Sequence, residues 1–285
     1  MWKLEGRLSA ITPFRASAGF TDRWRHFAYQ EDGGVVTVTF DRPERLNALT
    51  FEVYADLRDL LAELPHRDGP RVLVLTGSGR GFCSGGDVRD IIGPLQAMGT
   101  RELLEFTRMT GAVVRGLREL PLPVVAAVNG VAAGAGAVIA LAADFRLLAR
   151  SASLQFLFTK VGLAGADMGC AYLLPRLVGL GRATELLLLG DRVDAAQAER
   201  LGLATRVVDD ADLPAATAEL AGRLVAGPGL AYAATKLLLG REQDLPLSGA
   251  LELEAVTQAL LLRSDDHAEF YAAFNEGRAP SWTGR

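Results

Sequence analysis

The sequence predicts an α/β fold, and two strand–turn–helix stretches together with an apolar composition support this prediction. The first stretch, Pro123–Phe145, begins with the apolar run Val124–Val128, which is long enough for a buried strand. Asn129-Gly130 then predicts a tight turn, and small and apolar residues continue as a buried helix through Leu141. Such a unit places the start of a helix directly after a strand.

Small residues at the start of this predicted helix allow another group to approach the backbone closely. Free N–H groups at a helix start favour a developing negative charge, so this stretch is a candidate oxyanion hole. The spacing Gly134-Ala135-Gly136 also resembles part of a dinucleotide-binding fingerprint, but Ile139 replaces its third glycine. A third interpretation, tight packing of small residues in a core helix, is compatible with the first.

The second stretch, Val72–Val88, repeats the same order of elements. An apolar strand at 72–75 precedes a glycine-rich turn, and Asp87 is a suitable N-cap for a helix. Two turns of this kind in one chain can face each other across a site.

The composition fits one large core or two modest ones, because the chain has 285 residues and 49% of them are hydrophobic. A net charge of −4 argues against a nucleic-acid-binding surface. No apolar run reaches the roughly 20 residues of a membrane span, and the N-terminus lacks the apolar segment of a signal peptide. With only two cysteines, Cys83 and Cys170, far apart in sequence, we expect a cytoplasmic protein without a disulfide framework.

The chain before the second stretch predicts a hairpin and a helix. Asp32-Gly33-Gly34 is typical of a turn, and Val35–Phe40 is a β-rich strand that ends before Pro43. Thr50 is placed to cap a helix to about Leu64, whose leucines form one apolar face.

Helices and strands alternate through the middle of the chain. The helix that starts at Asp87 must be short, because glycines and a proline interrupt residues 91–100. A longer helix is expected at about 101–119, with one apolar face and prolines after it. Beyond the central stretch, strands are expected at 144–149 and 154–158.

The last third of the chain has a helical pattern, divided at Gly227-Pro228 and interrupted by a short strand near 205–208. Its last two helices are expected at 247–263 and 266–275. We therefore expect three parts: an N-terminal extension at 1–25, a core at 26–210 and a helical C-terminal part at 211–285.

Three motifs, in this order, resemble the signature of the crotonase superfamily, which includes enoyl-CoA hydratases and isomerases. They are DRPERLNAL at Asp41–Leu49, GRGFCSGGDV at Gly79–Val88 and PVVAAVNGVAAGAGAV at Pro123–Val138. The resemblance extends from about Val35 to the C-terminus. It implies a spiral core of ββα units and a helical C-terminal subdomain for oligomerisation, as a homotrimer or a dimer of trimers.

By this resemblance, two backbone N–H groups polarise the thioester carbonyl of an acyl-CoA so that an enolate can form. The matching positions in this sequence are Gly86 and Ala135. The family usually has glycine at the second position, but alanine retains the N–H.

The resemblance also implies a CoA-binding surface, with CoA arriving as part of the substrate and no separate cofactor. Its candidate residues are Arg45, Ala48, Ser84, Gly85 and Lys236. Arg45 and Lys236 have an equally simple interpretation as ordinary surface charges.

The usual pair of hydratase glutamates is absent, because Val138 and Phe158 stand at the matching positions and neither can transfer a proton. The acidic residue in the matched region is Asp167. Its position matches that of a functional aspartate in dienoyl-CoA isomerases, ring-epoxide isomerases and chlorobenzoyl-CoA dehalogenases. The segment 162–167 is one residue longer here than in those relatives. Asp167 is therefore the candidate acid/base of the site.

Asp167 has a second interpretation, as the N-cap of a helix over 168–174 that ends before Pro175. The two roles can coexist. An apolar acyl pocket around Asp167 would raise the pKa of its carboxyl group and make it a better base. The candidate pocket residues are Met109, Val138, Phe158 and Met168, with Phe156 beside them.

One carboxylate can move a double bond by removing a proton from one carbon and returning it to another, whereas hydration normally requires two groups. The missing glutamates therefore favour isomerisation over hydration of an enoyl-CoA. Two alternatives stay open: an acyl-CoA-binding protein without turnover, and a thioester hydrolase in which Asp167 directs water. A serine-hydrolase triad and a metal site are not expected, because the three histidines lie in polar stretches away from the motifs.

Overall fold

The computed structural model describes residues 20–284, so most of the predicted N-terminal extension lies outside the described residues. Six strands form the larger sheet, in the order β1-β2-β3-β5-β7-β10. Strand β1 runs antiparallel to β2, and all other neighbours in this sheet are parallel. The six strands are β1 (Ala28–Asp32), β2 (Val35–Phe40), β3 (Val72–Gly77), β5 (Val124–Val128), β7 (Phe145–Ala149) and β10 (Arg206–Val208).

Several predicted elements of this sheet are confirmed. The hairpin between β1 and β2 turns at Gly33 and Gly34, both with positive φ, and pairs Asp32 with Val35. The parallel strands need crossover connections, and helices provide most of them. Strand β5 is buried at all five positions, as its continuous apolar run predicts.

A second, four-stranded sheet was not predicted from the sequence. It has the order β4-β6-β8-β9, with β4 parallel to β6 and β6 parallel to β8. The predicted C-terminal end of the strand at 154–158 is wrong: the strand stops at Gln155, and Phe158 begins a short helical turn. The strands are β4 (Gly81–Cys83), β6 (Val131–Ala133), β8 (Ser153–Gln155) and β9 (Val193–Asp194), too short to show a periodicity.

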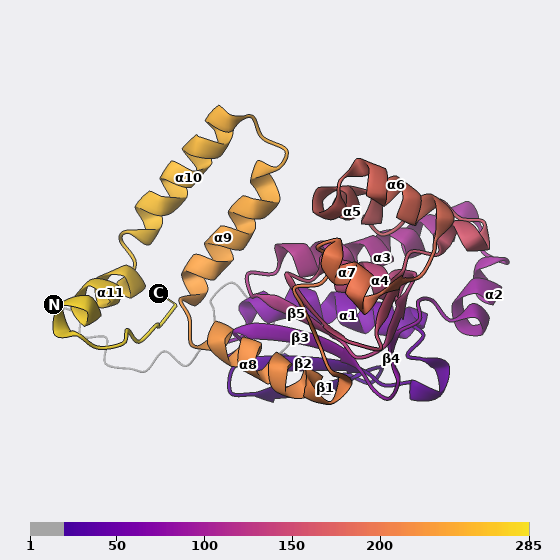
Figure 1. The fold of residues 1–285 in the computed structure, drawn as a ribbon, viewed down its shortest axis with the longest axis horizontal. Coiled ribbons are helices and arrows are strands. Elements are labelled where there is room, and N and C mark those ends of the chain that lie inside the picture. The colour runs from indigo at the N-terminus through magenta and orange to yellow at the C-terminus, as the bar shows by residue number, and fades with distance from the viewer. Residues whose placement is uncertain (1–19, 285) are drawn as a thin grey trace.

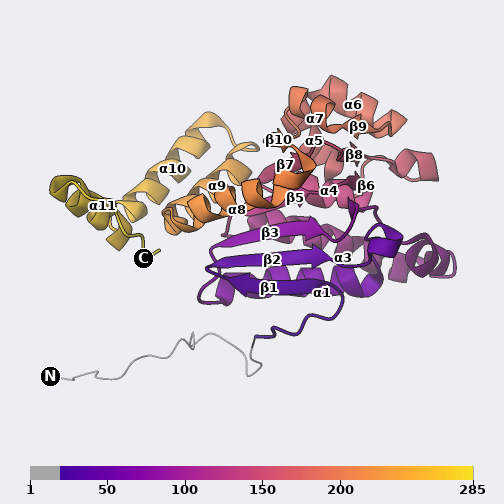
Figure 2. The ribbon, with the colours of Figure 1, turned by 60° about the horizontal axis from the view of Figure 1, so that its bottom comes forward.

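Helices enclose the larger sheet on both faces (Figures 1 and 2). Helix α8 (Leu213–Val225) packs along β2, β3, β5 and β7 on one face. Helices α1 (Phe51–Glu63) and α3 (Thr100–Glu119) pack against each other on the opposite face, and α4 (Ala135–Ala142) contacts α3. The side chain of Thr50 accepts a hydrogen bond from Val53 N–H, which confirms it as the cap of α1.

The remaining helices of the core are short. As predicted, the helical segment after Asp87 is brief, with a wide turn at Val88–Ile92 and α2 at Gly93–Leu95. Asp194 caps α7 by accepting from Gln197 N–H. These helices are α5 (Cys170–Val178), α6 (Leu180–Leu189) and α7 (Ala195–Arg200).

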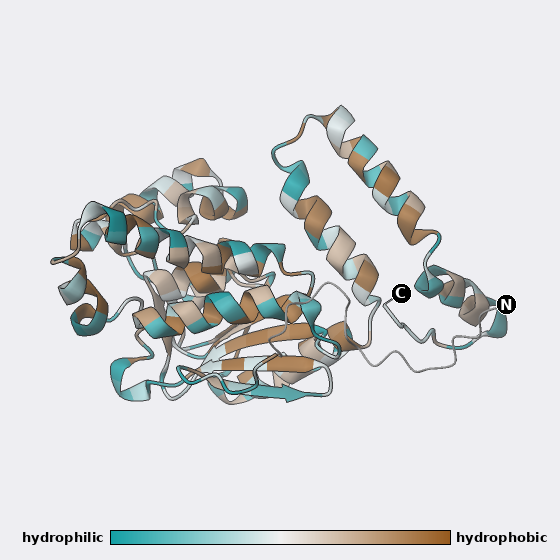
Figure 3. Ribbon diagram, turned by 180° about the vertical axis from the view of Figure 1, so that it is seen from behind, coloured by the Kyte–Doolittle hydropathy of each residue, from teal (hydrophilic) through white to brown (hydrophobic). Residues whose placement is uncertain are grey.

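The C-terminal helices form an arm that extends away from the core (Figure 1). Its elements are α9 (Gly229–Glu242), α10 (Leu247–Leu261) and α11 (Asp265–Glu276), close to the predicted bounds. Apolar residues show as brown segments along α9 and α10 in Figure 3, and none of the residues of these two helices is buried. Across residues 20–284, no helix has the length and apolar character to cross a membrane.

Candidate active site

The two predicted glycine-rich turns meet at a close contact between backbones. A Cβ on Gly136, in the first turn of α4, would overlap the carbonyl oxygen of Cys83 at the end of β4. A Cβ on Gly85 would lie 3.0 Å from Ala133 O and 3.5 Å from Ala135 N. Only glycine allows this approach, so the small residues in both motifs hold the two turns together.

Gly86 presents a free N–H at this contact. Leu49 N–H donates to Gly85 O at 2.8 Å, and Asp87 N–H donates to Leu49 O at 2.9 Å. In this parallel bridge the N–H of Gly86 itself points away from Leu49. It has no hydrogen-bond acceptor within residues 20–284.

Ala135 presents a second free N–H as the first residue of α4. Gly134, before it, has φ 51° and ψ −123°, a conformation that requires glycine, and its own N–H donates to Gln155 O. Ala135 itself is helical, so its methyl group is accommodated there. Because no acceptor for the Ala135 N–H occurs in the described chain, the two free donors lie at one place, at the N-terminus of a buried helix.

A guanidinium group supports the first donor, and sequence reasoning missed it. Arg42 donates to Ala48 O at 2.8 Å and lies 3.3 Å from the carboxylate of Asp87. Burial alone would raise the pKa of Asp87, but the N–H groups of Asp90 and Arg89 and the charge of Arg42 hold it below its usual value. Arg42 was recognisable only as part of the DRPERLNAL motif, without a role.

Two asparagines, the buried Asn47 and the partly exposed Asn129, fix the loop before β4. The Nδ2 of Asn47 donates to Gly81 O at 2.7 Å and to Ser78 O at 2.9 Å. The Nδ2 of Asn129 also donates to Gly81 O, at 3.1 Å, while its Oδ1 accepts from Gly77 N–H. These bonds explain why Asn stands in both motifs next to the turn, and why Asn47 tolerates a φ of 57°.

The other end of α4 is also fixed by a buried charge. Arg146 donates to Ala143 O and to Leu203 O, both at 2.6 Å, and more weakly to Leu141 O. Burial lowers the pKa of this guanidinium to about 10. A cation at the C-terminus of a helix is favourable, so Arg146 holds the helix that carries the second donor.

The structure brings together four of the five candidate CoA-binding residues. Ser84 N–H donates to Leu46 O at 3.0 Å, and Ser84 Oγ donates to Arg45 O at 3.3 Å. Arg45 is exposed, Ala48 is 8% exposed, and Gly85 follows Ser84 beside the hole. These residues form one surface next to the Gly86 donor.

Lys236 does not join this surface. Its ammonium lies 2.7 Å from Asp144 and donates to Leu117 O and Leu122 O at 2.9 and 3.0 Å. Only 9% of the side chain is exposed, and this burial lowers its pKa despite the adjacent carboxylate. Lys236 therefore fastens α9 to the end of α3, and its charge is engaged inside the protein.

Asp167 lies on the segment between β8 and α5, and its cap interpretation is wrong. Helix α5 begins at Cys170 after Gly169, continues through Pro175 and ends at Val178, rather than covering 168–174. The Asp167 carboxylate accepts instead from the N–H of Met168, at 2.8 Å, outside the helix. Partial burial raises the pKa of this carboxyl group, against the lowering effect of that single hydrogen bond.

The expected pocket residues are apolar and mostly enclosed, but they do not share one wall. Val138 is fully buried in α4, Phe158 is 7% exposed, and Met109 packs partly buried against the core. Met168 is 7% exposed and lines a separate cavity described below. Sequence reasoning also missed Tyr54, which is buried in α1 and lies within electrostatic range of Asp167 and Cys83.

Other chemistry is poorly supported by the geometry. Burial raises the pKa of the Cys83 thiol to about 12, so this cysteine does not supply a thiolate at neutral pH. Cys170 Sγ donates to Gly165 O, and burial raises its pKa too. His26 is engaged with Asp56 at 2.8 Å.

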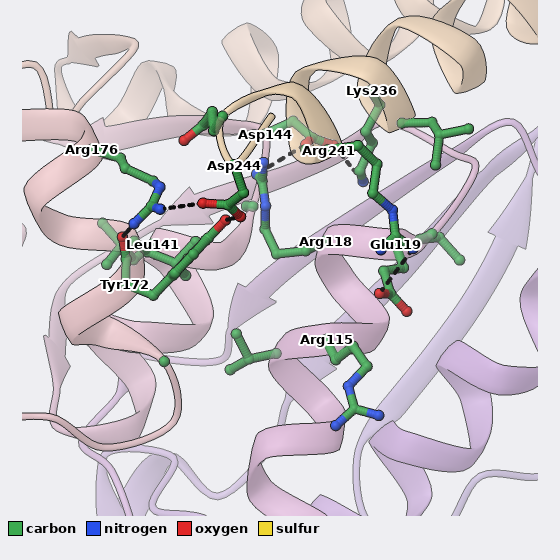
Figure 4. Close-up of a pocket in the computed structure, with 18 of the residues that line it drawn as sticks. Arg115, Arg118, Glu119, Leu141, Asp144, Tyr172, Arg176, Lys236, Arg241 and Asp244 are labelled. Carbon is green, nitrogen blue, oxygen red and sulfur yellow. Dashed lines mark hydrogen bonds and ion pairs between the residues drawn. The ribbon is translucent and has the colours of Figure 1, made fainter. Parts of the chain in front are cut away.

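A cavity of about 1310 Å³ lies between α3, α5 and α9 (Figure 4). Gly86 and Ala135 are not among its lining residues. Its charged groups are largely paired with one another: Asp244 accepts from Tyr172 at 2.6 Å and from Arg176 at 2.8 Å, and Arg118 lies 3.4 Å from Asp144. This cavity separates the C-terminal arm from the core and is distinct from the oxyanion hole.

The fold and the site define a class: an α/β protein with two sheets and two free backbone N–H groups between two glycine turns. Residues 30–285 match the family model for enoyl-CoA hydratase/isomerase. The chain is 41% identical over 256 residues to 1,2-epoxyphenylacetyl-CoA isomerase of Escherichia coli K12, covering 88% of this chain and 96% of that one.

Solved structures agree with this match. A Streptomyces coelicolor A3(2) chain assigned to the enoyl-CoA hydratases superposes with a TM-score of 0.94 at 59% identity, covering 96% of this chain and 100% of that one. Enoyl-CoA hydratase from Bacillus anthracis superposes with a TM-score of 0.86 at 29% identity, covering 92% and 100%. The chain belongs to the enoyl-CoA hydratase/isomerase family, and the predicted crotonase fold is confirmed.

Proposed function

We propose that this protein is an acyl-CoA isomerase that forms an enolate at the thioester of its substrate. The N–H groups of Gly86 and Ala135 would receive the thioester oxygen, because both are free and lie beside each other. Negative charge that develops on that oxygen would be stabilised by two donors and a helix N-terminus. The single observation that carries the proposal is this pair of free N–H donors. The candidate acid that goes with them is one half-buried carboxylate, Asp167.

Asp167 would act as the base and then as the acid. It would take a proton from one carbon of the acyl chain, giving the enolate, and return that proton to another carbon, which shifts the double bond. A carboxyl group with a raised pKa is better suited to this exchange at neutral pH. Val138 and Phe158 supply no second proton-transfer group, which favours isomerisation over hydration.

The acyl groups to be tested are chosen from the name of the Escherichia coli relative. Because the Escherichia coli relative is named for 1,2-epoxyphenylacetyl-CoA, we include arylacetyl thioesters and their epoxides among the substrates to test. CoA would be bound along Arg45, Ala48, Ser84 and Gly85, and no further cofactor is proposed.

Deuterium exchange tests the proposal directly. Wild type and Asp167→Asn are incubated in deuterated water with saturated, enoyl and arylacetyl-CoA thioesters, and mass and products are followed. We expect uptake by wild type and a loss of about 10²- to 10⁴-fold in the variant, the usual contribution of a positioned acid/base. The asparagine retains the shape of the side chain, so CoA-thioester binding is expected to persist.

The alternatives give different results in the same experiment. Binding of thioesters by wild type without uptake or product would indicate an acyl-CoA-binding protein, and release of free CoA would indicate a hydrolase. A hydrated product without isomer would indicate a hydratase. Uptake that is unchanged in Asp167→Asn would remove Asp167 from the chemistry.

We also propose that the arm forms the subunit contacts of a homotrimer or a dimer of trimers. Large exposed apolar side chains support this, including Leu247 at 75%, Leu260 at 72% and Phe274 at 74% exposed. Analytical sedimentation of wild type and Leu260→Glu measures the number of subunits in the assembly. A monomeric wild type would contradict the proposed trimer.

We propose a cytoplasmic location. The two free, buried cysteines are consistent with a reducing compartment.

A further inference from the structure

Tyr54 is buried, yet its hydroxyl has no hydrogen-bond partner within residues 20–284. Its ring is 3% exposed on α1 and packs edge-on against Phe106 of α3, with ring centroids 5.9 Å apart. None of the hydrogen bonds within residues 20–284 involves this hydroxyl. A buried hydroxyl without an acceptor costs free energy, so an acceptor from outside the chain is expected.

The hydroxyl faces an opening rather than packed side chains. The fully enclosed side-chain N and O atoms without a partner, among the described residues, are Trp24 Nε1 and Glu242 Oε1. Since Tyr54 Oη is unpaired and is not one of these atoms, it must be accessible from a cavity or solvent. The ring is enclosed, so only the oxygen end reaches that space.

Tyr54 lies near both halves of the candidate site. Two titratable groups are within electrostatic range of its hydroxyl: Cys83, at the end of β4, and Asp167. Helix α1 also starts at the hole, because Leu49, five residues before Tyr54, is hydrogen-bonded on both sides of Gly86. Tyr54, in the first turn of α1, is therefore close to the segment that carries Gly86.

The protonation state of Tyr54 makes it a donor. Burial is the largest cause that raises its pKa well above the usual value for tyrosine, and the Asp167 carboxylate acts in the same direction. The hydroxyl thus keeps its proton at any pH at which the protein works, and it can donate to an oxygen brought by the substrate. A pure hydrocarbon chain would displace water from this donor and leave it unpaired.

We propose that Tyr54 selects acyl groups that carry an oxygen acceptor beyond the thioester carbonyl, such as an epoxide, hydroxyl or ketone, by donating a hydrogen bond to that oxygen. This assignment rests on the proposed function, because it places the acyl chain between the two N–H donors and Asp167. A site built to pair a substrate oxygen discriminates against the analogue that lacks it, since a buried donor then stays unpaired.

The experiment compares Tyr54→Phe with wild type on matched pairs of thioesters. Each pair has one carbon skeleton, with and without an oxygen: an arylacetyl-CoA and its ring epoxide, and a saturated acyl-CoA and its hydroxy derivative. Deuterium exchange gives kcat and KM for both members. We expect wild type to prefer the oxygenated member, and Tyr54→Phe to reduce that preference by about 10- to 100-fold.

Controls separate selection from folding. Tyr271→Phe removes the same hydroxyl from a ring that is 68% exposed on α11, and it should leave the preference unchanged. Tyr54→Met fills a similar volume without an oxygen and should reproduce the loss seen with Tyr54→Phe. Thermal unfolding of all three variants confirms that the fold persists.

The remaining outcomes of this experiment would overturn either the role of Tyr54 or the proposed enolate chemistry. If Tyr54→Phe lowers exchange equally for both members, or shifts the acid limb of the pH profile for both, Tyr54 acts through Asp167 and the proposed selection is wrong. An unchanged preference in Tyr54→Phe also overturns it. Absence of exchange by wild type with every thioester would instead overturn the proposed enolate chemistry, whatever Tyr54 does.

Discussion

The two halves of the candidate site are built in different ways. The proposed oxyanion hole consists of main-chain N–H groups on two segments that touch at glycines, and hydrogen bonds from Leu49, Gly134 and Asn129 fix these segments. The proposed acid, Asp167, is a half-buried side chain on an irregular segment, with one hydrogen bond from its neighbour Met168. The first half is therefore fixed by the fold, and the second by a few local contacts.

This difference predicts two kinds of sensitivity. A main-chain donor survives most side-chain changes but fails when a Cβ separates the segments that hold it. A side-chain acid is lost by one substitution, and it is also displaced when its segment shifts. The predictions below test this contrast.

The largest effect is expected from Gly136→Ala. Because the added methyl group would overlap Cys83 O, the two glycine turns must move apart. We expect a loss of about 3 kcal/mol of unfolding free energy, at the upper end of the usual cost of overpacking, and activity below detection. Chemical denaturation and deuterium exchange measure the two effects.

Gly181→Ala is the matched control, because a Cβ there meets no atom within 4 Å on the exposed start of α6. It should change stability by no more than about 0.5 kcal/mol. A mild effect of Gly136→Ala would show that the contact between the turns is looser than the structure indicates.

The second largest effect is expected from Ala135→Pro. Proline is tolerated at the first position of a helix, so this change removes one N–H and leaves α4 in place. Removal of one oxyanion donor lowers kcat by about 10²- to 10³-fold. Exchange kinetics measure the loss, and Ala135→Gly, which keeps the N–H, serves as the control with little change expected. Equal activity of the proline variant would exclude Ala135 as a donor.

A smaller effect is expected from Gly165→Ala, which displaces the acid without touching the hole. A Cβ at Gly165 would lie 2.5 Å from Leu187 O, so the segment that carries Asp167 must shift. A displacement of about 1 Å costs up to about 100-fold in rate. The absorbance of a bound conjugated acyl-CoA reports polarisation by the hole and should stay as in wild type. A change in that spectrum would mean that the two halves are coupled.

The contact between the two glycine turns could be predicted from the sequence because it depends on glycine, a residue type with few other uses at such positions. Glycines at 85, 134 and 136 stand where side chains would collide or where φ is positive, and they cluster after apolar strands. The short strands β4 and β6 between them were missed, since three residues carry no periodicity.

The surroundings of Asp167 could not be predicted in the same way. A single aspartate before a predicted helix fits a cap and an acid equally, and only the observed start of α5 at Cys170 decides against the cap. Tyr54 was not singled out in the sequence, and Lys236 was a candidate for CoA binding or an ordinary surface charge. Their roles depend on contacts with residues more than 100 positions away, such as Leu117 for Lys236, which local patterns do not encode.

The smallest expected effect concerns the stability of Asp167→Asn. Burial raises the pKa of the native carboxyl group above its value in the unfolded chain, so between these two values the folded state binds more protons. The free energy of unfolding therefore falls as pH rises through this window, and the ionised carboxylate remains a cost at neutral pH. Asparagine removes that charge, and its side-chain oxygen can still accept from Met168 N–H.

We therefore expect Asp167→Asn to be more stable than wild type at pH 7.5, with a gain that shrinks as the pH falls toward 4. Urea denaturation at both pH values measures it, and Asp68→Asn, on an exposed turn, should show little pH-dependent difference. A variant less stable than wild type at both pH values would mean that the bond from Met168 outweighs burial. Asp167 would then be a structural residue. A variant that is more stable than wild type but inactive would instead indicate that Asp167 is kept for the chemistry at the expense of stability. The glycine turns that carry the two N–H donors differ in this respect, because their contacts stabilise the fold.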